Sequence, residues 1–203
     1  MIAIIDYGMG NLHSVKNALD HLGIENVITS DISLIQQADK LILPGVGAFY
    51  DCMENLQSKG LIKVIKERVE AGVPLLGICL GMQVLFEDGY EVKHAKGLGF
   101  LKGSVTLMED ESVKIPHIGW NALHFNHHSS LQKYLSKLPY VYFVHSYRGV
   151  QCDDVDVLAY AHYGSLQIPA LVQKGNVVGA QFHPEKSAKE GLAILKWFEE
   201  EFS

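Results

Sequence analysis

The sequence predicts an α/β domain with a central, mostly parallel sheet, flanked by helices and extended by antiparallel strands. The first 80 or so residues alternate short apolar runs with segments that are apolar at helical spacing, which indicates parallel strands covered on both faces. Beyond residue 104, strand-like segments follow one another, which indicates antiparallel pairing. A length of 203 residues suits one sizeable core, and no repeat or linker divides it. We therefore expect a single domain over residues 1–203.

The elements of the first half follow from apolar periodicity. The predicted strands are residues 2–5, 26–29, 40–43 and 75–78. The first predicted helix opens at Asn11 and closes at Gly23, and the second ends at Gly72. Their apolar faces are Val15, Ala18, Leu19 and Leu22 in one helix, and Leu61, Val64, Ile65 and Val69 in the other. A further helix-like run, residues 82–86, follows Cys79.

The second half contains segments with the character of strands. They are residues 104–108, 119–125, 141–147, 155–161, 166–173 and 177–182. Gly175 and Asn176 form a predicted hairpin turn between the last two. A C-terminal helix carries Leu195, Phe198 and Phe202 on one stripe.

Composition excludes several classes of protein. The formal net charge is −6 and no run of Lys and Arg exceeds two residues, which argues against a nucleic-acid surface. The first residues carry no secretory pattern, and no apolar stretch approaches membrane-spanning length. The three cysteines, Cys52, Cys79 and Cys152, form no CxxC pair, which favours a reducing compartment. We expect the protein in the cytoplasm.

The pentapeptide Gly77-Ile78-Cys79-Leu80-Gly81 has the layout of a nucleophile elbow. It joins an apolar run to a helix-like run, and the sharp turn between them requires small residues two positions before and after the nucleophile. Such a turn lifts the Cys79 sulfur to a helix N-terminus, where partial positive charge favours the thiolate. The alternative is a buried cysteine in a glycine-rich turn.

The segment from Gln181 to Lys186 is the second strong feature. In an extended chain the side chains of His183 and Glu185 point the same way, and Pro184 between them keeps His183 out of the helical region. A carboxylate beside a histidine can hold the imidazole in one tautomer, as in a catalytic triad. The alternative is a surface turn in which these two residues are incidental.

Pro44-Gly45-Val46-Gly47 follows a predicted strand and suits the presentation of backbone N–H groups. Acyl transfer needs two such donors for the developing oxyanion, and an elbow supplies one from the residue after the nucleophile, here Leu80. The loop around Val46 and Gly47 would supply the other, if the sheet is parallel. A simple turn is the alternative.

Other candidate sites are weaker. Residues 6–11 lie at a strand–helix junction, but they lack the third glycine of a dinucleotide-binding loop. His124, His127 and His128 lack a familiar metal-ligand spacing, so we interpret them as loop residues in solvent. Cys52 and Cys152 lack an elbow context and are interpreted as structural.

Together, the elbow around Cys79 and the His183-Pro184-Glu185 segment resemble the triad-type, class I glutamine amidotransferases over essentially the whole chain. More specific segments resemble the glutaminase subunits of imidazole glycerol phosphate synthases, from histidine biosynthesis. These segments are residues 6–11 (DYGMGN), 44–47 (PGVG), 116–121 (PHIGWN), 142–148 (YFVHSYR) and 183–187 (HPEKS). The resemblance implies a flavodoxin-like fold and no metal or organic cofactor.

The resemblance also implies roles for individual residues. Cys79 would attack the side-chain amide of glutamine. His183 would take the thiol proton and then protonate the departing ammonia, and Glu185 would orient His183. Val46, Gly47 and Leu80 would form the oxyanion hole, after a rearrangement of the 44–47 loop. The glutamine pocket would be lined by Gly47, Gln83, His145, Ser146 and Tyr147.

A partner is implied as well, namely a cyclase subunit with a (β/α)8 barrel that forms a heterodimer with this chain. It would receive ammonia through an internal tunnel and make imidazole glycerol phosphate and an aminoimidazole carboxamide ribotide. Trp120 and Lys186 match interface positions. One alternative is a paralogous glutaminase that supplies ammonia to another synthase, such as one amidating a surface sugar. A non-catalytic module on the same scaffold is a second alternative.

Overall fold

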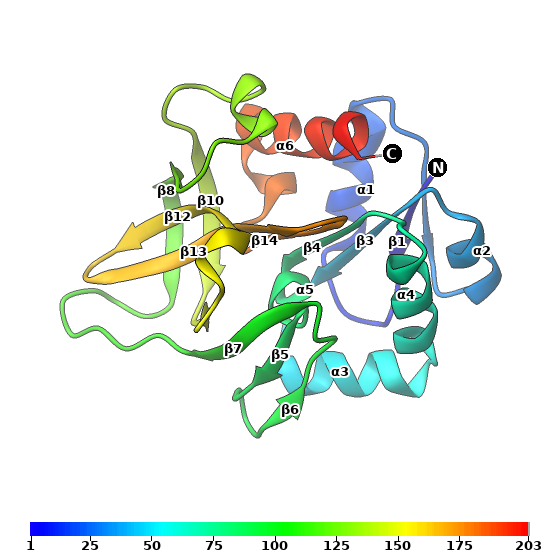
Figure 1. Ribbon diagram of the computed structural model, residues 1–203, viewed down its shortest axis with the longest axis horizontal. Helices are drawn as coiled ribbons and strands as arrows, with labels where there is room; N and C mark the ends of the chain where they lie inside the picture. The colour runs from blue at the N-terminus through cyan, green and yellow to red at the C-terminus, as the bar shows by residue number, and fades with distance from the viewer. Residues whose placement is uncertain (203) are drawn as a thin grey trace.

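The computed structural model describes residues 1–202, so that Ser203, the last residue of the expected domain, lies outside the described residues. Across these residues the main sheet has eight strands in the order β2-β1-β3-β4-β14-β13-β12-β9 (Figure 1). The strands from β2 to β14 are parallel, and β13, β12 and β9 extend them antiparallel. In sheet order they are Asn26–Thr29, Ile2–Ile5, Lys40–Gly45, Leu75–Cys79, Val177–Ala180, Leu166–Lys174, Val157–Tyr163 and His124–Phe125. The predicted α/β class, with an antiparallel extension, is confirmed.

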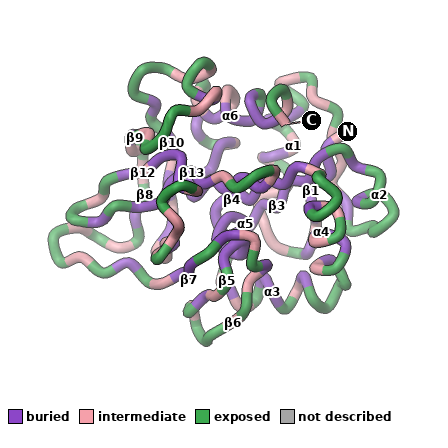
Figure 2. Tube along the Cα trace, in the orientation of Figure 1, coloured by how far each residue is buried: buried purple, intermediate pink, exposed green. Residues whose placement is uncertain are grey.

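Helices cover both faces of the parallel strands. One face packs against α1 (Leu12–His21) and α6 (Ala188–Glu201), which bury Val15, Leu19 and Trp197. The other face packs against α2 (Ile32–Gln37), α3 (Phe49–Ser58) and α4 (Leu61–Glu70). Figure 1 shows α1 and α6 on the side of the sheet opposite to α3 and α4. The buried trace in Figure 2 runs along the strands between these layers, where the apolar faces of the helices meet the sheet.

Smaller sheets flank the main one within residues 1–202. β8 (His117–Ala122) pairs with β10 (Tyr140–His145). β11 (Tyr147–Val150), β7 (Leu101–Leu107), β5 (Phe86–Gly89) and β6 (Ala95–Lys96) form another sheet. Short helical turns are α5 (Leu80–Gln83), η1 (Ser130–Lys133), η2 (Asp154–Asp156) and η3 (Pro184–Lys186). The turn from β10 into β11 joins the two small sheets and faces the end of β4.

Several predicted boundaries are wrong. Only Met82 and Gln83 of the helix-like run at 82–86 lie in a helix, the single turn α5, because Phe86 pairs with Leu101 and begins strand β5. The predicted strand at 119–125 is divided into β8 and β9, and the one at 141–147 into β10 and β11. The hairpin at Gly175 and Asn176 is confirmed, since it joins β13 to β14. No helix within residues 1–202 has both the length and the apolar character needed to cross a membrane.

Candidate active site

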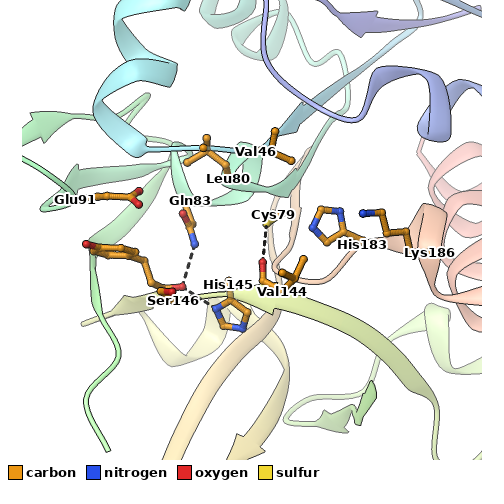
Figure 3. A pocket seen from close by; sticks show the side chains of 12 residues that line it. Val46, Cys79, Leu80, Gln83, Glu91, Val144, His145, Ser146, His183 and Lys186 are labelled. Atoms are coloured by element: carbon orange, nitrogen blue, oxygen red, sulfur yellow. Dashed lines mark hydrogen bonds between the residues drawn. The ribbon is translucent and has the colours of Figure 1, made fainter. Parts of the chain in front are cut away.

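A cavity of about 310 Å³ opens where β3 and β4 end, and its wall is completed by the β10–β11 turn (Figure 3). The structure brings most of the predicted site residues together in its lining. These are Val46, Gly47, Cys79, Leu80, Gln83, His145, Ser146, Tyr147, His183 and Lys186. Glu185 lies behind His183, and Trp120 lies on β8, outside the lining.

Cys79 ends β4 in a strained backbone conformation. Its φ of 55° and ψ of −110° are unusual for a residue with a side chain, as expected for a nucleophile elbow. The flanking glycines are required by close contacts. A Cβ atom on Gly77 would lie 2.5 Å from the Gly81 carbonyl oxygen, and one on Gly81 would lie 1.7 Å from the Leu43 carbonyl oxygen. The GxCxG spacing is therefore needed to pack the turn against β3. The helix that follows Cys79, α5, is only one turn long, so its dipole places little positive charge beside the Cys79 sulfur.

The His183–Glu185 pair lies directly beside Cys79. His183 Nδ1 is 2.8 Å from Glu185 Oε1, and both side chains are at most 2% exposed. Because a carboxylate accepts, Nδ1 carries a proton and Nε2 is left as the reactive nitrogen. Within the described residues, His183 Nε2 has no hydrogen-bond partner. The Cys79 thiol contacts the Val144 carbonyl oxygen at 3.9 Å instead. Catalytic hydrogen bonds of this kind commonly tighten only when substrate binds.

The charge state of His183 reflects these neighbours. Burial by itself lowers the pKa of the imidazole, but the adjacent Cys79 sulfur and the Glu185 carboxylate outweigh it and raise the pKa to about 9. The site therefore favours an imidazolium at neutral pH. Such a cation stabilises a thiolate beside it and holds the proton that a leaving amine needs.

The local backbone of this pair differs from the sequence prediction. His183 is extended, as Pro184 requires, but residues Pro184–Lys186 form the 3₁₀ turn η3 rather than a strand. Glu185 reaches His183 across this turn, so the expected pairing arises by a different route. The peptide N–H of His183 donates to the Tyr142 carbonyl at 2.9 Å, which ties the turn to β10.

The loop after β3 lies beside Cys79 because Gly45 and Cys79 are partners in the parallel β3–β4 register. Gly47 has a φ of 102°, which favours glycine, and a Cβ atom there would lie 2.5 Å from the Met9 methyl group. Val46 is 43% exposed at the cavity. Val46 and Gly47 line the cavity together with Cys79, and backbone N–H groups are the donors that an oxyanion there needs.

Gln83, His145 and Tyr147 are connected by hydrogen bonds. Gln83 Nε2 donates to the Tyr147 carbonyl at 3.0 Å, and His145 Nδ1 lies 2.8 Å from the same carbonyl (Figure 3). Gln83 Nε2 also donates to Gln181 Oε1 at 3.1 Å. Gln181 Nε2 in turn lies 3.9 Å from Cys79 Sγ. Burial lowers the pKa of His145 to about 3, so this ring is neutral.

Sequence reasoning missed several residues of the site. Glu91, in the loop between β5 and β6, lines the cavity, and no motif pointed to it. Its carboxylate accepts from the Phe49 N–H at 2.8 Å, and burial raises its pKa in spite of that bond. Asn11 Nδ2 lies 3.4 Å from Glu185 Oε1. The position of Gln181 could have been predicted, because it precedes His183 by two residues in an extended segment and so points to the same face.

The remaining candidates lie elsewhere. Lys186 is exposed at the cavity mouth beside His183, and Trp120 is 53% exposed and packs edge-on against Tyr142. His127 contacts Asp154 and His128 contacts Gln132. Residues 1–202 contain no group of three or more His, Cys, Asp or Glu side chains placed to hold a metal ion. Burial raises the pKa of the Cys52 thiol to about 12 and that of Cys152 to about 11, which leaves both unreactive.

Comparison with known proteins identifies the family of this chain. The family model described as "Glutamine amidotransferase class-I" matches residues 3–200, and the chain belongs to this family. Among its relatives, the imidazole glycerol phosphate synthase subunit HisH of Lactococcus lactis subsp. lactis (strain IL1403) is 54% identical over 200 residues, which cover 98% of each chain. The subunit HisH of Aquifex aeolicus (strain VF5) is 50% identical over 196 residues, covering 96% of this chain and 94% of that one. Within the amidotransferases, the chain groups with these HisH subunits.

Solved structures share the fold. A glutamine amidotransferase crystal structure superposes with a TM-score of 0.75 at 23% identity, covering 98% of this chain and 97% of that one. A structure of PurLQS from Thermotoga maritima has a TM-score of 0.76 at 21% identity, covering 100% and 98%. At these identities the likeness concerns the fold alone.

Proposed function

We propose that this chain is the glutamine-hydrolysing subunit of an imidazole glycerol phosphate synthase and acts through a Cys79–His183–Glu185 triad. The observation that carries the proposal is the position of Cys79. It ends β4 on a strained elbow and faces a 310 Å³ cavity. It also lies beside the buried imidazole of His183, whose Nδ1 is hydrogen-bonded to the Glu185 carboxylate. The family match and the relatives at about half identity support the reaction class.

In the proposed first step, His183 takes the thiol proton of Cys79, and the Cys79 sulfur attacks the amide carbon of glutamine. The carbonyl oxygen becomes an oxyanion, which the N–H of Leu80 and an N–H of the Val46–Gly47 loop stabilise. The C–N bond then breaks, and His183 gives its proton to the departing nitrogen, which leaves as ammonia. Cys79 is left as a thioester of glutamate.

In the second step, water attacks the thioester carbon and His183 accepts a proton from that water. The C–S bond breaks and releases glutamate, and the regenerated thiolate again faces the imidazolium. The Glu185 carboxylate stabilises the positive charge on His183. The raised pKa of His183, about 9, suits a group that must hold this proton at neutral pH.

The cavity suits an amino acid that carries an amide. Its lining offers the Glu91 carboxylate for an α-ammonium group, and polar groups of Gln83, Ser146 and Tyr147 for the remainder of the substrate.

We further propose that the ammonia passes through a tunnel to a cyclase subunit with a (β/α)8 barrel, in a cytoplasmic heterodimer of histidine biosynthesis. The exposed apolar side chains of Ile118 and Trp120 on β8 and Tyr140 on β10 support a docking face near the cavity. Trp120 and Lys186 are the proposed contacts. The names of the relatives favour this partner over a synthase that amidates a surface sugar.

Co-purification with the cyclase, followed by glutaminase assays with and without its nucleotide ligand, tests the proposal. The lone chain should hydrolyse little glutamine, and the partner with ligand should stimulate it. Cys79→Ala should abolish synthesis from glutamine but preserve synthesis from added ammonium. Loss of both activities would assign Cys79 a structural role, and full activity of the lone chain would contradict dependence on a partner.

A further inference from the structure

Two buried histidines form a pair behind the cavity wall. His117 on β8 and His145 on β10 are partners in the antiparallel register, and His117 Nδ1 lies 3.1 Å from His145 Nε2. His117 is 2% exposed and His145 is 6% exposed. The His117 ring stacks on Phe143 at 4.7 Å and on Tyr163 at 4.1 Å, so its plane is held by aromatic contacts. His145 lines the cavity, but His117 does not.

The carbonyl of Tyr147 determines where the protons of this pair lie. A carbonyl oxygen only accepts, so His145 Nδ1 carries a proton and Nε2 of the neutral ring is an acceptor. His117 must then donate from Nδ1 to His145 Nε2. Its own Nε2 is left as an acceptor, which faces Asn121 Nδ2 at 3.4 Å. Burial lowers the pKa of His117 to about 4, which agrees with a neutral pair.

The same carbonyl determines the orientation of the Gln83 amide. Tyr147 O receives a second hydrogen bond from Gln83, so the NH₂ group of Gln83 must face Tyr147. The other N–H of that group donates to Gln181 Oε1. Both donors of Gln83 are thereby used on the protein. Its amide oxygen has no hydrogen-bond partner among residues 1–202, and the residue lines the cavity.

We propose that His117 is a positioning residue for glutamine binding: through His145 and the Tyr147 carbonyl, it holds Gln83 with its amide oxygen available to the substrate as an acceptor. This inference rests on the proposed function and deepens it. Without the bond from His117, the His145 ring is free to turn, and the Tyr147 carbonyl loses one of the two donors that hold it. Gln83 can then rotate its amide and present N–H groups where the substrate needs an acceptor.

A double-mutant cycle in the assembled synthase tests this coupling. His117→Phe keeps an aromatic ring for stacking but removes both nitrogens. It should raise the KM for glutamine about tenfold, as expected for one lost hydrogen bond, with a much smaller change in kcat. In a Gln83→Ala background the same substitution should change KM little, because the residue through which it acts is gone. Additive effects of the two substitutions would overturn the proposal.

A matched pair of variants separates positioning from packing. The side-chain nitrogen of an asparagine lies near the place of Nδ1, whereas that of a glutamine reaches the place of Nε2. His117→Asn should therefore retain the donor to His145 and bind glutamine much better than His117→Gln. Equal KM values for these two variants would contradict the role of Nδ1, even if His117→Phe proves too unstable to assay.

Imidazole ¹⁵N chemical shifts of the isolated wild-type chain give a readout that does not depend on activity. Both rings should be neutral, with the proton on Nδ1. Protonation at Nε2 of either ring would refute the inference, whatever the chain does with glutamine. Conversely, a synthase without glutaminase activity but with these tautomers would refute the proposed function and leave the hydrogen-bond chain intact.

Discussion

Gly45 and Cys79 lie opposite each other in the parallel pairing of β3 and β4. The strand that leads into the proposed oxyanion loop and the strand that carries the proposed nucleophile therefore end side by side. A Cβ atom on Gly45 would lie 2.9 Å from the Gly81 nitrogen and 2.6 Å from the Tyr7 hydroxyl. Close packing around Gly45 thus positions the proposed oxyanion loop beside the proposed nucleophile.

Gly81→Ala should destabilise the fold by more than about 3 kcal/mol, because its methyl group would overlap the Leu43 carbonyl oxygen and force backbone shifts. Urea unfolding measures this change. Gly23→Ala is the matched control, since Gly23 has a φ of 72° but nothing within 4 Å of an added Cβ. That control substitution should lower the free energy of unfolding by about 1 kcal/mol, because alanine is disfavoured at a positive φ. Equal losses would mean that the elbow tolerates a side chain at Gly81.

The pH dependence of glutaminase activity should have an alkaline limb near pH 9. In the proposed mechanism His183 must carry a proton to release ammonia, and its pKa is raised to about 9, so activity should fall as the pH rises through that value. Glu185→Gln removes a negative charge that supports the imidazolium. It should move this limb to lower pH and reduce kcat about a hundredfold. The measurement is kcat/KM against pH in the assembled enzyme, and an unmoved limb would remove Glu185 from the triad.

Stability should fall as the pH decreases below about 6.5, the ordinary pKa of histidine. His117 and His145 have folded-state pKa values of about 4 and about 3, so the unfolded chain binds more protons in this range. The stability that these two neutral histidines contribute is fully present above pH 6.5, and it is lost as the pH falls towards their pKa values in the folded state. Urea unfolding from pH 7.5 to 5 should show a shallower decline in His117→Phe, by on the order of 1–2 kcal/mol. Parallel profiles would mean that His117 titrates normally.

Asn11→Ala should affect catalysis more than stability. Asn11 precedes α1 but makes no side-chain capping bond among the described residues, and its amide approaches Glu185 instead. We expect kcat to fall by about threefold and the free energy of unfolding to change by less than about 0.5 kcal/mol. Asp31→Ala is the converse control, because Asp31 caps α2 through Ser33 and should cost about 1 kcal/mol with no effect on kcat.

Trp120→Ala should weaken assembly with the cyclase by at least about tenfold and leave the isolated chain stable, because its ring is half exposed. Isothermal titration of the two subunits measures the affinity. Val155→Ala, at an exposed site in η2, should leave it unchanged. A wild-type affinity for Trp120→Ala would place the docking face elsewhere.

The grouping of Cys79, His183 and Glu185 in one site could be predicted from the sequence, because these residues lie in short motifs whose local geometry is known. The helix α3 was missed although Phe49, Cys52, Met53 and Leu56 have helical spacing and are buried. The helix after Cys79 was overextended because its apolar run is also compatible with a strand, and long-range pairing of Phe86 decides between them. Neither Glu91 nor His117 could be assigned a role in the site from local pattern, because tertiary packing brings them to the cavity or to His145.

The backbone hydrogen bond between His183 and Tyr142 connects the proposed catalytic histidine to β10. β10 pairs with β8, which displays Trp120 on the outside, and β10 also accepts the peptide N–H of the proposed catalytic histidine. The Tyr142 N–H in turn donates to the Ser187 hydroxyl, at the other end of the same turn. A protein bound to β8 would therefore be connected to the proposed catalytic histidine through the pairing of β8 with β10 and the hydrogen bond from His183 to Tyr142.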